Sequence, residues 1–75
     1  MLTLDQALEI ADRRQRNGLR EAVGFGHALG EPVGFLRRSA ARGIAFEAVA
    51  LDSARTCARV DPRGDLHLGA HDDAR

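Results

Sequence analysis

The clearest hydrophobic pattern in the chain lies between Arg42 and Val60, where apolar and small residues recur every three or four positions. On a helix of 3.6 residues per turn, these positions fall within an arc of about 100°, the width of a core-facing stripe. Gly43 precedes the stripe, and a turn-forming stretch follows it at residues 61–64. The pattern therefore predicts a central helix over residues 42–60. Its inward stripe comprises Phe46, Val49, Ala50, Ser53, Cys57 and Val60.

Three shorter helices are predicted before this segment. Thr3 and Gln6 have the spacing of a capping box, in which each side chain accepts a hydrogen bond from the other residue's backbone N–H. The first helix is therefore expected to begin after Thr3, and the Asn-Gly pair at residues 17–18 is expected to end it. A second helix is predicted over residues 19–29. A third begins at Pro32, where a missing N–H costs a helix nothing, and runs to Arg42.

The last part of the chain is predicted to be extended. Residues 65–68 alternate like a short strand, and the polar residues 69–75 are expected to form a frayed tail. The predicted fold is all-α: one small domain over residues 1–68, with four short helices and a short extended C-terminal segment. The alternative is an α+β fold with a C-terminal β-hairpin or meander, its strands at residues 46–51, 57–60 and 65–68. Strands rich in alanine fit strand preferences poorly, which favours the helical interpretation.

The size of the chain favours association with another chain. With 75 residues, it forms one domain at most, and such a domain buries only about 60% of its unfolded surface. Much of its apolar content is alanine, which contributes little buried area per residue. A homodimer, an accessory subunit or an inhibitor of another protein is therefore the expected function class.

One surface of the predicted central helix is the candidate interface. Ile44, Ala48 and Leu51 would lie opposite Phe46 and Cys57. Short neighbouring helices could not cover both sides of a helix in so small a chain, and an uncovered apolar patch is typical of an interface. These three residues are therefore predicted to contact another chain, either a second copy or a different protein.

The charge of the chain is balanced overall but uneven along its length. The formal net charge is zero, and all 11 basic residues are arginine, a bias that a GC-rich genome also produces. Residues 1–31 carry four arginines and five acids (−1), residues 32–60 carry five and two (+3), and residues 61–75 carry two and four (−2). Zero net charge argues against a function based on general attraction to nucleic acid or to a membrane surface.

The basic middle of the chain supports a second function class. The stretch LRRSAARGIAFEAVALDSA, residues 36–54, resembles the two-helix portion of ribbon-helix-helix repressors and antitoxins. That resemblance implies a DNA-binding regulator or antitoxin. The family reads DNA with a strand just before its first helix. That place is taken here by GEPVGF, which fits a strand poorly, so no DNA-contacting residue carries over. On charge alone, the candidates for contact with an anion or nucleic acid are Arg37, Arg38 and Arg42.

No arrangement typical of an enzyme, a metal site or a cofactor site stands out. Cys57 is the only cysteine, so neither a disulfide within the chain nor a multi-cysteine zinc site is available. On the predicted stripe it is expected to be buried rather than a reactive thiol activated by a histidine. His67, His71, Asp72 and Asp73 are spaced poorly for converging on a metal, because Gly69 interrupts them. With no signal peptide or apolar span evident, a soluble, cytoplasmic, non-enzymatic protein without cofactors is expected.

Overall fold

The computed structural model describes residues 1–69 and contains two helices followed by four strands. The helices are α1 (Leu4–Ile10) and α2 (Arg13–Ala28). The strands form one antiparallel sheet in the order β1-β2-β3-β4. They are β1 (Val33–Ala40), β2 (Gly43–Ala50), β3 (Thr56–Val60) and β4 (Leu66–Leu68).

This architecture is α+β, so the all-α prediction of a small helical protein is wrong. The predicted third helix is β1, and the predicted central helix is β2, a loop and β3. The resemblance of residues 36–54 to a pair of helices fails for the same reason. In β2 the buried residues lie on both faces of the strand, so the polar alternation that identifies a strand is missing. The α+β alternative was correct in kind, although it omitted β1.

The boundary between α1 and α2 also differs from the prediction. The Thr3–Gln6 capping box is confirmed at the start of α1. α1 ends at Ile10 and does not reach residues 17–18. A second capping box, between Asp12 and Gln15, starts α2 at Arg13. Asp12 accepts the N–H of Gln15 at 3.0 Å, which satisfies a backbone donor that a continuous helix would have bonded internally.

Short turns connect the strands of the sheet. Gly43, at φ 140°, is the first residue of β2, directly after the β1–β2 turn, and does not end a helix. The predicted turn at residues 61–64 is confirmed, since the N–H of Gly64 donates to the carbonyl of Asp61 at 2.9 Å. The register between β2 and β3 shifts beside Cys57, which is the extra residue of a β-bulge.

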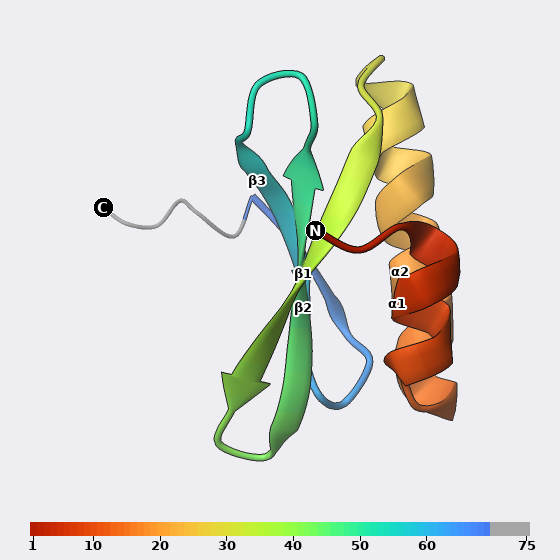
Figure 1. Ribbon diagram of the computed structural model, residues 1–75, viewed down its shortest axis with the longest axis vertical. Coiled ribbons are helices and arrows are strands. Elements are labelled where there is room, and N and C mark those ends of the chain that lie inside the picture. Colours follow the sequence, from red (N-terminus) through yellow and green to blue (C-terminus); the bar gives the residue numbers. More distant parts are fainter. Residues whose placement is uncertain (70–75) are drawn as a thin grey trace.

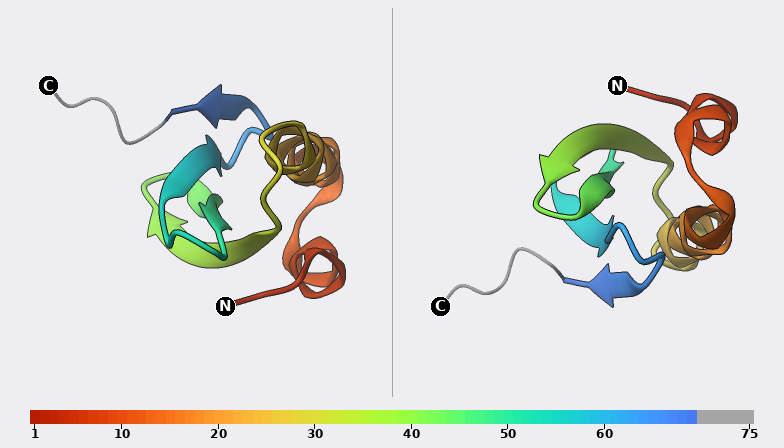
Figure 2. Two further views of the ribbon diagram at one scale, coloured as in Figure 1. Left: turned by 90° about the horizontal axis from the view of Figure 1, so that it is seen from above. Right: turned by 90° about the horizontal axis from the view of Figure 1, so that it is seen from below.

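Both helices pack on the same face of a strongly twisted sheet (Figure 1, Figure 2). The core lies between these two layers, where α2 contacts all four strands and α1 contacts β1. Its largest fully buried side chains are Leu19 from α2, Phe35 from β1, Phe46 from β2 and Val60 from β3. The opposite face of the sheet has no helix of the described residues against it.

Small residues let α2 approach the sheet closely. Gly18, Ala22 and Gly26 are buried at four-residue spacing on one side of α2. A Cβ at Gly18 would lie 2.8 Å from the carbonyl oxygen of Gly64, and one at Gly26 would overlap the side chain of Val33. This spacing stops with the helix, because Gly30, at φ 78°, lies beyond the C-cap residue Leu29.

A buried glutamine joins α2 to two strands. The side-chain amide of Gln15, only 3% exposed, donates to the carbonyl of Ile44 on β2 and to that of Asp61 at 3.1 Å. Its amide oxygen accepts the N–H of Asp12 at 3.4 Å. Every polar atom of this side chain therefore has a partner, as burial requires.

Candidate functional site

The open face of the sheet, which points away from the helices, carries apolar residues of β1, β2 and β3 that lie outside the main core. Side chains alternate across a strand, and Phe35, Phe46 and Ala48 belong to the core beneath the helices. Their neighbours therefore point to the opposite face. On that face Ala45, Val49 and Cys57 are buried but lie outside the main core, and Leu36 is half-buried.

Met1 and Leu51 meet over Gly34 at one end of this open face. A Cβ at Gly34 would lie 2.5 Å from the sulfur of Met1 and 3.0 Å from Cδ2 of Leu51. Both side chains are nevertheless mostly solvent-exposed, Met1 at 65% and Leu51 at 51%. They border a groove of about 210 Å³. We call this the Met1–Leu51 groove; its lining residues are Met1, Leu2, Thr3, Leu4, Val33, Gly34 and Leu51.

Several contacts hold Leu51 in place although its side chain is exposed. Its N–H donates to the carbonyl of Pro32 at 2.9 Å. In the β2–β3 loop, the hydroxyl of Ser53 donates to the carboxylate of Glu31 at 3.1 Å, and the Arg55 guanidinium pairs with the same carboxylate at 3.3 Å. The loop is thus tied to the α2–β1 connection, so that the groove has a fixed wall rather than a frayed one.

A row of charged side chains crosses the rest of the open face. Arg38 of β1 pairs with Glu47 of β2 at 3.1 Å. The sheet register places Glu47 opposite Arg59 and Arg59 opposite His67. Surface ion pairs of this kind contribute little to stability, so the row is a polar part of this face rather than a source of its stability.

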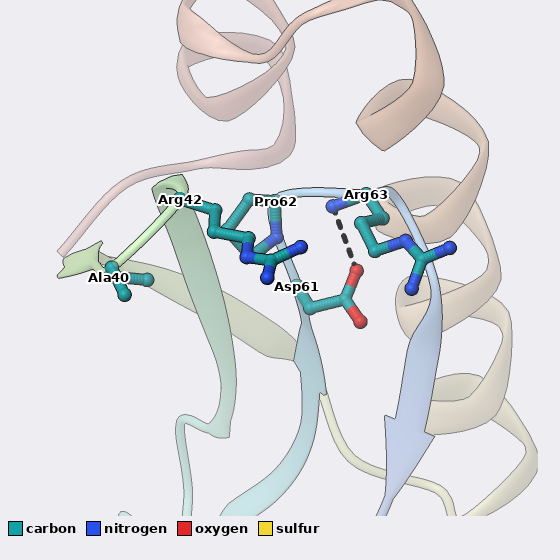
Figure 3. A pocket seen from close by; sticks show the side chains of 6 residues that line it. Ala40, Arg42, Asp61, Pro62 and Arg63 are labelled. Carbon is teal, nitrogen blue, oxygen red and sulfur yellow. Dashed lines mark hydrogen bonds between the residues drawn. The ribbon is translucent and has the colours of Figure 1, made fainter.

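A second hollow lies at the other end of the molecule, between the β1–β2 and β3–β4 turns (Figure 3). It has a volume of about 250 Å³. Arg42 and Arg63 extend from the two turns on either side of the Asp61 carboxylate (Figure 3), and Pro62 also lines the hollow. Asp61 accepts three hydrogen bonds, from the N–H groups of Arg63 and Asp65 and from the His67 ring at 2.8 Å.

These partners lower the pKa of the Asp61 carboxyl, with the hydrogen bond from His67 as the largest cause. A lowered native pKa means that Asp61 stabilises the protein above its ordinary pKa of 3.8, and that this contribution disappears as the pH falls through the native value. We expect Asp61→Asn to lower the melting temperature at pH 7 and to reduce the loss of stability between pH 5 and pH 3. Thermal melts across this range provide the measurement, with Asp65→Asn as the control. An unchanged acid limb in Asp61→Asn would contradict the assignment.

The structure does not bring the three predicted interface residues to one surface. Ala48 is fully buried in the core, and Ile44 is half-buried on the helix-facing side. Only Leu51 is exposed, directly after the end of β2. Met1 and Gly34 were not identified from the sequence as interface residues, because neither an N-terminal residue nor a glycine contributes to a repeating pattern of apolar positions.

The three predicted arginines gather at the β1–β2 hairpin, but they do not share a face. Arg37 and Arg38 are consecutive strand residues, so their side chains point to opposite faces. Arg38 is paired with Glu47, and Arg42 lies at the hollow beside Arg63. Arg63 was not among the sequence-based candidates, since only the fold brings it beside Arg42.

Cys57 is 3% exposed, which confirms that it is buried, although it lies in a β-bulge rather than on a helix. Within residues 1–69, no group of three or more His, Cys, Asp or Glu side chains is placed to hold a metal ion. His71, Asp72, Asp73 and almost all of the predicted tail at residues 69–75 lie outside the described residues. Neither described helix is long and apolar enough to cross a membrane.

Comparisons with family models, with curated proteins and with solved structures give no match to this chain.

Proposed function

We propose that this protein is a non-enzymatic interaction module that associates with a second protein chain through the Met1–Leu51 groove. The observation that carries the proposal is the placement of two large, mostly exposed apolar side chains over Gly34, on a sheet face that no described helix covers. Exposed apolar side chains gathered at a concave site are typical of protein contacts.

The fixed position of the groove supports the same proposal. Leu51 is held by a backbone hydrogen bond to Pro32, and Met1 is held by the pairing of its neighbour Leu2 with Phe35. Two anchored walls lose little conformational freedom when a partner binds, which favours association. A second copy of this chain is the occupant that can be tested first.

We expect the wild-type protein to self-associate at high micromolar concentration and Leu51→Glu to weaken that association at least about tenfold, because a carboxylate would be desolvated in the contact. Multi-angle light scattering over a concentration series provides the measurement. Far-ultraviolet circular dichroism of Leu51→Glu should match the wild type, since the side chain that is replaced is 51% exposed.

Leu68→Glu is a matched control. Leu68 is the same residue type and is exposed to a similar extent, 55%, but it lies on β4 at the opposite edge of the sheet. Its replacement should leave self-association unchanged. A wild type that stays monomeric at high micromolar concentration would refute the second copy as occupant, and equal losses in both variants would refute the groove as the contact.

A further inference from the structure

The outer edge of β1 already accepts one added residue. The N–H of Leu2 donates to the carbonyl of Phe35 at 2.7 Å, and the N–H of Phe35 donates to the carbonyl of Leu2 at 2.9 Å. This exchange is the hydrogen-bonded pair of an antiparallel ladder. The N-terminal segment therefore occupies one rung on the side of β1 that faces away from β2.

The next rungs along this edge are open. Because the N–H and C=O groups of a strand point to the same side at every second residue, those of Arg37 and Ser39 face outward as those of Phe35 do. Leu2 is the only described residue outside the named strands that bridges to β1. Arg37 and Ser39 thus offer two donors and two acceptors to an incoming strand.

The charge of this edge determines which strand it favours. Arg37 and Arg38 are both exposed and point to opposite faces, with Arg42 close by in the turn. Glu47, the ion-pair partner of Arg38, is the only acid among the residues of β1, β2 and their connecting turn. An incoming strand with acidic residues would be attracted on both faces of the sheet.

We propose that the free edge of β1, from Arg37 to Ala40, binds an acidic, extended segment of another protein as a fifth strand of the sheet. This mode of recognition uses backbone hydrogen bonds for affinity and side chains on alternate faces for selectivity. It concerns a different surface from the Met1–Leu51 groove and does not depend on it.

Two other occupants fit this edge less well. A second copy paired edge to edge would bring two sets of Arg37 and Arg38 together, and like charges across a strand pair are destabilising. A nucleic acid backbone would satisfy the arginines, but its phosphates only accept hydrogen bonds, so the outward carbonyls of Arg37 and Ser39 would lack donors. A peptide strand supplies both kinds of group.

The test uses a fluorescein-labelled peptide, acetyl-Thr-Val-Glu-Glu-Val-Thr-amide, whose consecutive glutamates point to opposite faces as Arg37 and Arg38 do. We expect binding by fluorescence anisotropy with a dissociation constant on the order of 100 µM. The Thr-Val-Lys-Lys-Val-Thr peptide should bind at least about tenfold more weakly. No binding of the acidic peptide at about 1 mM, or equal binding of both peptides, would overturn the proposal.

The backbone contact is tested by Ser39→Pro, which removes an outward N–H while leaving the ladder with β2 intact. We expect the acidic peptide to bind this variant at least about fivefold more weakly, the loss of one hydrogen bond. Ser39→Ala keeps the N–H and should bind like the wild type. Equal binding by Ser39→Pro and Ser39→Ala would overturn the proposal.

Two further arms cover the remaining outcomes. If Ser39→Pro does not fold, the wild type is tested with the fully N-methylated acidic peptide, which cannot donate at either edge; unchanged binding would overturn the proposal. A short DNA duplex that binds more tightly than the acidic peptide would also overturn it. Leu51→Glu should bind the peptide like the wild type, which separates this site from the Met1–Leu51 groove.

Discussion

Replacing Gln15 with leucine is expected to destabilise the protein by about 3 kcal/mol. The substitution leaves the carbonyls of Ile44 and Asp61 without their donor and removes one half of the capping box that starts α2. Each unsatisfied buried polar group costs about 1–3 kcal/mol. A chain of this length has roughly 4–11 kcal/mol of stability in total, so the loss is a large fraction of it.

Gln6→Leu is the matched control for this prediction. Gln6 occupies the same capping-box position at α1, but it is exposed and its side chain bonds only to Thr3 within the described residues. Its replacement should cost only about 1 kcal/mol. Urea unfolding followed by circular dichroism measures both losses. Equal losses of stability in Gln15→Leu and Gln6→Leu would show that the hydrogen bonds from Gln15 to the sheet contribute nothing to stability.

Replacing glycine with alanine in α2 is expected to lower the stability of the protein at Gly18 and to raise it at Gly24. At Gly18 an added Cβ would lie 2.8 Å from the carbonyl oxygen of Gly64 and 2.9 Å from Cγ1 of Val60. The helix must then move away from the sheet, so Gly18→Ala should destabilise the protein by about 2 kcal/mol despite the better helix propensity of alanine. At Gly24 nothing lies within 4 Å of an added Cβ, and Gly24→Ala should stabilise by about 1 kcal/mol.

The difference between the two variants isolates the close contact of α2 with the sheet. Both replace glycine by alanine inside the same helix, so the change in propensity is shared. Chemical unfolding of the two proteins under one condition gives a difference of about 3 kcal/mol if the contact is as close as described. Gly18→Ala with stability equal to or above the wild type would mean that α2 can shift without cost.

The elements whose signals are local could be predicted from the sequence. The Thr3–Gln6 capping box and the turn at residues 61–64 depend only on neighbouring residues. The start of α2 uses the same chemistry, since Asp12 and Gln15 have the spacing of Thr3 and Gln6. The Asn-Gly pair at residues 17–18 is typical of a helix end and obscures this signal, but it lies inside α2.

β1 and β2 could not be identified from hydrophobic periodicity. Alanine is small enough to be buried on either face of a strand, and β2 contains Ala45, Ala48 and Ala50, all buried. With apolar residues at both odd and even positions, every third or fourth residue also matches a helical stripe. Helix propensity then favoured the wrong element, and sheet pairing overrode it.

The candidate site was predictable only in part for a related reason. Leu51 is exposed because it lies just after Ala50, the buried last residue of β2. Its partner Met1 reaches it through the bridge between Leu2 and Phe35, a contact across 33 positions of sequence. The open edge at Arg37 and Ser39 likewise depends on knowing that β1 is a strand, and that it is the outer one.

The order β1-β2-β3-β4 has a consequence for synthesis on the ribosome. Each strand pairs with the one made just before it, and both helices precede the whole sheet. Because of this order, each strand after β1 is synthesised when the strand that it pairs with and both helices have already been made. No strand waits for a strand partner made much later, and each new strand covers the free edge of the strand before it, whereas the outer edge of β1 beyond the Leu2 bridge is covered by none of the described strands.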